Sequence, residues 1–227
     1  MKHGKRYSEL AKSFDGKKAY EAAEALEIAK KTSNVKFDSS IEVHILLGID
    51  PKKSDQQVRA NVSLPHGIGR TKRIAVFTSQ PDKEKEAKEA GADLIGGEDL
   101  VNEIIQKGKL DFDVAVATPE MMPKMAKIAK ILGPRGLMPS PKNETVTPNV
   151  RKAVEELKKG RISFKNDDTG NLHQAIGRSS FTKEQLLENY ASFMETVRKA
   201  KPSAAKGNYI RKVTITSTMG PGVKVAV

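Results

Sequence analysis

Few residues of this 227-residue chain are of types that commonly do chemistry, and their spacing does not favour catalysis. The chain has no cysteine, which excludes disulfides and thiolate metal ligands. Its four histidines lack the short spacing of metal ligands, and they stand at His3, His44, His66 and His173. Structural or solvent roles are favoured for them, although His173 follows a turn and could reach a ligand.

The acidic and glycine-rich stretches are also incomplete as reactive motifs. Asp167-Asp168-Thr169-Gly170 resembles the start of a calcium loop, but the remaining oxygen ligands are missing, so a hairpin turn is favoured. The "GIG" at 67–69 lacks the third glycine of a dinucleotide fingerprint, and it precedes a strand instead of following one. The chain contains neither a G-x-x-x-x-G-K-[ST] loop nor a G-x-S-x-G elbow. The sequence therefore predicts no catalytic site, no metal and no cofactor.

Three stretches have compositions that packing alone does not explain. "NVKFDSS" (34–40) places Lys36 and Phe37 beside polar residues, although Phe37 by itself would be expected to anchor a core. "GPRGLMPSPK" (133–142) holds three prolines and two glycines in ten positions. "STMGPG" (217–222) interrupts the apolar alternation of the last strand, which is expected to run from 213 to 225.

The two ends of the chain alternate between strand and helix patterns. Apolar residues at every second position predict strands at 41–45, 58–64, 162–164, 172–176 and 213–225. We expect the first two of these to pair as a hairpin. Helical periodicity is present at 17–30 and again from Thr182, where Gln185 completes a capping box, up to the break at Pro202.

The middle of the chain has a different pattern, in which short buried-type strands at 73–77, 92–95 and 113–117 are each followed by a helical segment. This βαβαβα order predicts a parallel sheet with covering helices. Pro123 should interrupt the third helix. A further helix is expected at 147–160, with Thr147 as its N-cap and Pro148 at its first position.

These patterns predict an α/β protein of two domains. Residues 1–67 and 160–227 are each too short to bury much surface alone, and together they form one discontinuous α+β domain with antiparallel strands. Residues 68–159 form an inserted, Rossmann-like parallel α/β domain. Two connections, near 66–70 and 159–161, make a hinge between the domains the default expectation.

The charge of the chain indicates a polyanionic partner. The formal net charge is +12, which points first to phosphate backbones and second to anionic membranes. The outer halves hold 23 Lys and Arg against 14 Asp and Glu, and residues 68–159 hold 17 against 14. The discontinuous domain is therefore the better candidate for binding a polyanion. Neither a secretory signal nor a membrane-spanning run is present, so a cytoplasmic location is expected.

An ordered set of segments resembles the bacterial large-subunit ribosomal protein L-one family. The segments are "MKHGKRY", "KFDSSIEVHILLGIDPKKSDQQVRANVSLPHGIGR", "GADLIGGEDL", "ILGPRGLMPSPK", "KPSAAKGNYI" and "STMGPGVKV". Short glycine-rich fragments are weak signals one by one, but their common order along the chain is highly specific. The chain departs from the family pattern at Ser140, at Asn143-Glu144 and at Gln174-Ala175.

The resemblance implies a two-domain protein of the large ribosomal subunit that binds 23S-type rRNA and forms the mobile lateral stalk near the tRNA exit site. It further implies that the protein assists release of deacylated tRNA, and that the same surface binds the messenger of its own operon and represses translation. We expect a monomer off the ribosome. The RNA-contact residues implied by the resemblance are Lys36, Phe37, Ser40, Thr218, Met219 and Gly220, with Lys165 and His173 as less certain matches.

Two other classes of function stay open from the residues alone. An enzyme could use the inserted α/β domain to bind a nucleotide or metabolite, although the phosphate loop is missing. A generic basic chaperone or nonspecific nucleic-acid binder would fit the charge as well, and it would not distinguish a specific RNA from random RNA of equal length.

Overall fold

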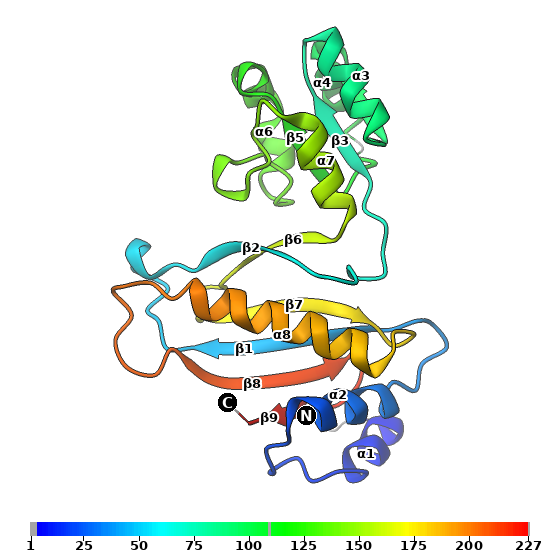
Figure 1. Ribbon diagram of the computed structural model, residues 1–227, viewed down its shortest axis with the longest axis vertical. Helices are drawn as coiled ribbons and strands as arrows, with labels where there is room; N and C mark the ends of the chain where they lie inside the picture. The colour runs from blue at the N-terminus through cyan, green and yellow to red at the C-terminus, as the bar shows by residue number, and fades with distance from the viewer. Residues whose placement is uncertain (1–3, 109, 227) are drawn as a thin grey trace. The chain divides into compact units, whose positions relative to one another are not determined.

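The computed structural model describes residues 4–108 and 110–226, which form two compact units (Figure 1). Unit 1 contains Met1–Gly69 and Ile162–Val227, and unit 2 contains Arg70–Arg161. One sheet is antiparallel and another is parallel with helices, so the predicted α/β class with two kinds of sheet is confirmed.

Unit 1 is built on a four-stranded antiparallel sheet. Its order is β7 (Asn171–Arg178), β1 (Ser40–Leu47), β8 (Ile210–Ser217) and β9 (Val223–Val225). Every second residue of β1 is fully or almost fully buried, and the residues between them are half-buried. This period of two separates the sheet into an apolar face and a polar face.

Two helices cover the apolar face of this sheet, as Figure 1 shows for α2 (Ala22–Lys31) and α8 (Lys183–Lys199). Phe193 of α8 is completely buried and meets Phe164 edge-on, with ring centroids 5.2 Å apart. The capping box predicted for α8 is present, because the Thr182 side chain accepts from the Gln185 N–H and the Gln185 side chain accepts from the Thr182 N–H. A short helix α1 (Lys5–Lys12) precedes them and was not predicted.

The predicted pairing of the first two strands is wrong. β2 (Arg59–Ser63) instead pairs with β6 (Arg161–Lys165) in a separate two-stranded sheet. The physical reason is that both edges of β1 are already occupied, one by β7 and the other by β8. A short 3₁₀ turn, Ser54–Gln56, lies between β1 and β2.

The last strand was also predicted incompletely, because it is two strands. β8 ends at Ser217 and β9 returns antiparallel to it, with Val213 opposite Val225 and Ile215 opposite Val223. The interruption of the alternation at 218–222 is therefore the connection of a hairpin. A related difference occurs at 166–170, where a tight turn joins β6 and β7, which belong to different sheets.

Unit 2 contains a parallel sheet in the order β4 (Leu94–Gly96), β3 (Ile74–Phe77) and β5 (Val114–Ala117). Its longer helices are α3 (Pro81–Glu89), α4 (Glu98–Lys107) and α7 (Val150–Lys158). Apolar residues form one core on each face of this sheet. After β5 the chain forms four consecutive short turns, η2 (Pro119–Met121), α5 (Met122–Met125), η3 (Ala126–Ile128) and α6 (Ala129–Leu132).

Two details of unit 2 differ from or extend the sequence analysis. The N-cap of α7 is Asn149 and not Thr147 as predicted, because the Asn149 side chain accepts the Lys152 N–H. The Thr147 hydroxyl accepts the N–H of Asn149, in the turn before the helix. The proline-rich stretch 133–142 packs Leu137 and Met138 against the core and leads into η4 (Pro141–Asn143). That packing gives part of this stretch a structural role.

Within the part of the chain that the structure describes, no helix has the length and apolar character needed to cross a membrane. Within residues 4–108 and 110–226, no group of three or more His, Cys, Asp or Glu side chains is arranged to hold a metal ion.

Candidate nucleic-acid interface

The segments 34–40 and 217–222 meet at one end of the four-stranded sheet. The Thr218 N–H donates to the Ser40 carbonyl at 3.0 Å, and the Ser40 N–H donates to the Thr218 hydroxyl at 3.0 Å. These reciprocal bonds continue the ladder of β1 and β8 by one step. The Thr218 hydroxyl therefore accepts from the Ser40 N–H, and it also donates to the Ser40 carbonyl at a longer distance of 3.4 Å.

Met219 lies at the most strained point of this turn. Its φ of 61° is in the left-handed region, and the Gly220 N–H donates to the Ser217 carbonyl at 2.8 Å across it. This is the third position of a type II turn, where glycine is the usual residue. The Met219 side chain is 67% exposed. A methionine held in a strained conformation and in solvent points to a function beyond packing.

Phe37 is 51% exposed, so the alternative that it anchors a core is wrong. It and Met219 are two of the four large apolar side chains that are exposed among the described residues. Both belong to the pair of segments joined through Ser40 and Thr218. Exposed apolar groups in a strongly basic chain suit contacts with ribose or with base faces.

Packing within the turn requires glycine at position 220. A Cβ at this position would lie 2.2 Å from the Ser217 hydroxyl oxygen and 3.2 Å from the Ser217 carbonyl. The space that glycine leaves open is therefore filled from inside the turn. The Ser217 hydroxyl is buried and has no hydrogen-bond partner among the described residues.

Arg6 was missed by the sequence analysis, and it ties the two segments together. Its guanidinium donates to the Asn34 carbonyl and to the Met219 carbonyl, both at 2.9 Å. Arg6 stands on the short helix α1, 213 positions from Met219 along the chain. The basic run "KRY" at 5–7 was the only local signal, and it does not indicate a partner so remote.

Asp38 fixes the shape of the first segment. Its carboxylate accepts from the Ser179 hydroxyl at 2.8 Å and from the Ser180 hydroxyl at 2.9 Å, and its carbonyl accepts from Arg178. Burial raises the pKa of Asp38, but the hydrogen bonds from Ser179 and Ser180 and the charge of Arg178 outweigh it, so the pKa lies below its ordinary value. Asp38 is thus an ionised anchor.

His173 lies on the polar face of the sheet, directly opposite His44 of β1, with their Nδ1 atoms 2.8 Å apart. Burial lowers the pKa of His44, and the nearby His173 lowers it further, against a smaller opposite effect of Glu42. A neutral imidazole is therefore favoured at His44, and the hydrogen bond between the two Nδ1 atoms joins β1 and β7 on this face.

The candidate residues are only partly gathered by the structure. Ser40, Thr218, Met219 and Gly220 belong to one contact cluster, and Lys36 and Phe37 are exposed on the segment that enters it. His173 of β7 lies opposite His44, which is four residues from Ser40 along β1. At the rise of a strand, this places His173 roughly 13 Å from the cluster. Lys165 is exposed at the end of β6 and is not in that sheet, and no hydrogen bond or ion pair within the described residues joins it to the cluster.

A polar sheet face and a strained, exposed turn, in an α/β chain of net charge +12, are features suited to contact with a polyanion. The family model described as "Ribosomal protein L1p/L10e family" matches residues 29–221. The chain therefore belongs to this family of ribosomal proteins. The family is one of ribosomal proteins and not of enzymes, which decides against the alternative of a nucleotide- or metabolite-binding enzyme.

Similar proteins extend this match over nearly the whole chain. A "Large ribosomal subunit protein uL1" of Salinispora tropica is 53% identical over 225 residues, covering 99% of this chain and 94% of the relative. The protein of the same name from Saccharopolyspora erythraea is 53% identical, covering 99% and 93%. That of Thermosipho melanesiensis is 52% identical, covering 99% and 96%.

Proposed function

We propose that this chain assembles with the large ribosomal subunit by binding its rRNA through the surface formed by Lys36, Phe37, Ser40, Thr218, Met219, Gly220 and the nearby His173, with Lys165 as a peripheral contact. The observation that carries the proposal is the exposed, strained Met219 beside the exposed Phe37 in a chain of net charge +12. The names of the similar proteins, which place them in the large ribosomal subunit, support it.

The chemistry of this surface suits an irregular region of RNA more than a regular duplex. Specific RNA recognition uses bases and 2′-hydroxyls in loops and distorted helices, where apolar side chains can pack on sugars and bases. The Thr218 hydroxyl can turn its proton from the Ser40 carbonyl, a long bond of 3.4 Å, to a phosphate or 2′-oxygen, while it still accepts from the Ser40 N–H. Lys36 adds the electrostatic part of the affinity.

The finer roles implied by the resemblance belong to the same proposal. The bound rRNA forms a mobile lateral stalk near the tRNA exit site, and this stalk assists the release of deacylated tRNA. The surface also binds a similar structure in the messenger of the protein's own operon, which represses translation. The protein is a cytoplasmic monomer when it is off the ribosome.

Specific and random RNA should be bound with clearly different affinities. We expect the full chain to bind a large-subunit rRNA fragment at least 10³-fold more tightly than a scrambled RNA of equal length, by analogy with specific nucleic-acid binders. Filter binding of both RNAs at one salt concentration measures the ratio. Equal affinity would leave the generic basic binder as the better hypothesis.

We further propose that residues 1–67 and 160–227 form an independent RNA-binding domain, with 68–159 as an insertion that moves on hinges near 66–70 and 159–161. The units defined by contacts meet at Gly69–Arg70 and Arg161–Ile162, close to these boundaries. Unit 1 has its own continuous apolar core, which is the physical basis for independent folding.

Removal of unit 2 should therefore leave RNA binding in place. We expect a chain in which 68–159 is replaced by a short glycine-serine linker to fold and to keep its affinity for the rRNA fragment within about tenfold. Circular dichroism checks folding, and filter binding with the specific and scrambled RNAs checks recognition. A folded variant that treats both RNAs alike would place the recognition elsewhere.

A further inference from the structure

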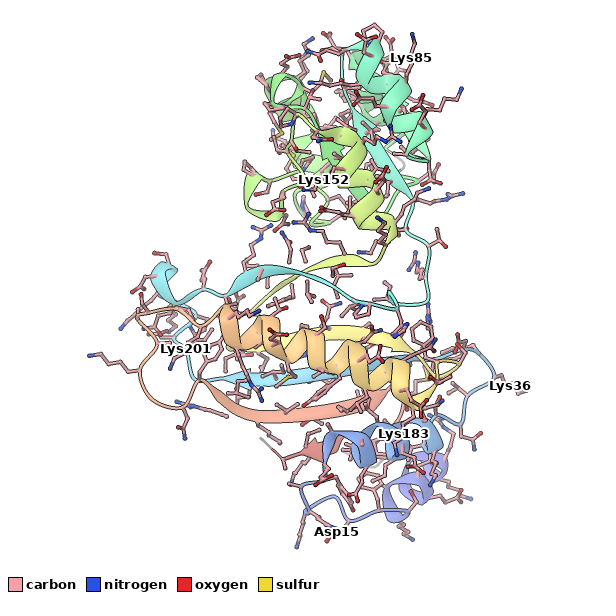
Figure 2. All side chains as sticks on the ribbon, viewed as in Figure 1. Asp15, Lys36, Lys85, Lys152, Lys183 and Lys201 are labelled. Atoms are coloured by element: carbon pink, nitrogen blue, oxygen red, sulfur yellow. The ribbon has the colours of Figure 1, made fainter. Side chains whose placement is uncertain are left out.

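A second basic feature lies at the opposite end of β8 from the Met219 turn. It is a pocket of about 570 Å³, called here the basic pocket, lined by Arg198, Lys201, Asn208, Tyr209, Ile210 and Arg211. The seven residue steps along β8 separate the two ends by about 23 Å, at about 3.3 Å per residue. Figure 2 labels Lys36 and Lys201 at opposite ends of unit 1.

The charge of the basic pocket is not balanced locally. Its three cationic side chains, Arg198, Lys201 and Arg211, are exposed, and none of them has an ion pair with a carboxylate of the described residues. The last acidic residue in the sequence is Glu195, whereas residues 196–227 contain seven lysines and arginines. Uncompensated cations around a concave surface raise the local concentration of anions.

The wall of the basic pocket is held in a defined position. The Gly48 N–H donates to the Tyr209 carbonyl at 2.7 Å. A Cβ on Gly48 would lie 2.2 Å from the Asn208 carbonyl oxygen and 3.2 Å from Arg211 Nε, so the loop packs directly on the end of β1. The backbone of Asn208 and Tyr209 is therefore held against the end of β1, and Arg211 Nε lies close to Gly48.

Tyr209 lines the same wall and also belongs to the apolar core of unit 1. The residue is only 8% exposed, and its hydroxyl has no hydrogen-bond partner among the described residues. Burial raises the pKa of Tyr209 to about 12, so the hydroxyl keeps its proton. Because the hydroxyl oxygen is itself buried, Tyr209 supports the wall of the pocket by packing, and the exposed cationic side chains are the groups that can reach a ligand.

We propose that the basic pocket binds a phosphate group. Two guanidinium groups and an ammonium group match the charge and hydrogen-bonding capacity of phosphate oxygens. The volume also admits more than one phosphate. The phosphate could belong to a free polyphosphate such as a nucleotide, or to the backbone of an RNA bound to unit 1.

The test uses tripolyphosphate as its first probe, with the full chain. Isothermal titration at low salt is expected to show binding that Arg198→Gln/Arg211→Gln weakens at least tenfold. Lys85→Gln/Lys88→Gln removes the same charge from exposed positions of α3 and should change the affinity less than twofold. Changes in the NMR chemical shifts of backbone amides on addition of tripolyphosphate should be confined to residues 198–211. An equal loss in both variants, or shifts that lie elsewhere, would overturn the proposal.

A second arm identifies the source of the phosphate. For a backbone phosphate of RNA, the slope of log affinity against log salt for the rRNA fragment should fall by about 1 to 2 in the Arg198→Gln/Arg211→Gln variant, since each lost phosphate contact contributes about 0.7–0.9. For a free polyphosphate, that slope should not change and tripolyphosphate should bind beside the RNA. Both results presuppose that tripolyphosphate binds at the basic pocket. The tripolyphosphate titration contains no RNA, so its outcome does not depend on the proposed rRNA function.

Discussion

Replacement of Asn189 with alanine is expected to lower the free energy of unfolding of unit 1 by about 3 kcal/mol. Asn189 stands on α8 and is completely buried. Its Nδ2 donates to the carbonyls of Gly67 and Ile176, at 2.9 and 2.8 Å, and its Oδ1 accepts the His66 N–H at 3.1 Å. Alanine would remove all three bonds and leave the buried Ile176 carbonyl without a partner, and such a group costs about 1–3 kcal/mol.

Urea unfolding followed by tyrosine fluorescence measures this loss specifically. The chain has no tryptophan, and its four tyrosines all lie in unit 1, so the signal does not report on unit 2. The matched control is Ser192→Ala on the same helix, which removes one exposed bond from the Ser192 hydroxyl to the Ser63 carbonyl. We expect the control to cost less than about 1 kcal/mol. Similar losses in the two variants would show that the Asn189 bonds are not decisive.

The same residue shows what sequence patterns miss. Helical periodicity located α8 and its capping box, because both signals are local. Asn189 is a polar residue on an apolar helix face, and nothing near it in the sequence names His66 or Gly67 as its partners. Its role depends on which segment crosses the helix, and that is a property of the tertiary fold.

Strand pairing failed for a related reason. A period of two tells which residues of a strand share a face, and it correctly separated Ile41, Val43 and Ile45 from the polar residues between them. It does not tell which strand lies alongside. β2 follows β1 closely in sequence, but both edges of β1 were taken by strands from the far end of the chain.

The candidate site was predictable as a set of residues but not as a geometry. The resemblance supplied Thr218, Met219 and Gly220, and the broken alternation marked the same position. Backbone dihedral angles are not written in the sequence, so the left-handed Met219 was invisible beside two glycines that could have taken that role. Arg6 was invisible because its contact spans 213 positions.

That geometry allows the site to be tested with opposite effects on stability and on binding. Met219→Gly should leave the free energy of unfolding unchanged or raise it by up to about 1 kcal/mol. The positive φ of Met219 costs about 1–3 kcal/mol of strain, and glycine adopts this φ without that cost. Part of the gain is lost because glycine gives the unfolded chain more conformational freedom. The same variant should bind the rRNA fragment about 5- to 150-fold more weakly, since one lost stacking or readout contact is worth about 1–3 kcal/mol.

Two further variants separate the side chain from the backbone. Met219→Ala should lose as much RNA affinity as Met219→Gly without the relief of strain, and Met219→Leu should keep most of the affinity because it retains an apolar group of similar size. Leu187→Ala removes another exposed apolar side chain of unit 1 and should alter RNA affinity less than twofold. If Met219→Gly gains stability and keeps its affinity for RNA, the exposed methionine is not a contact, and the strain at this turn has another cause.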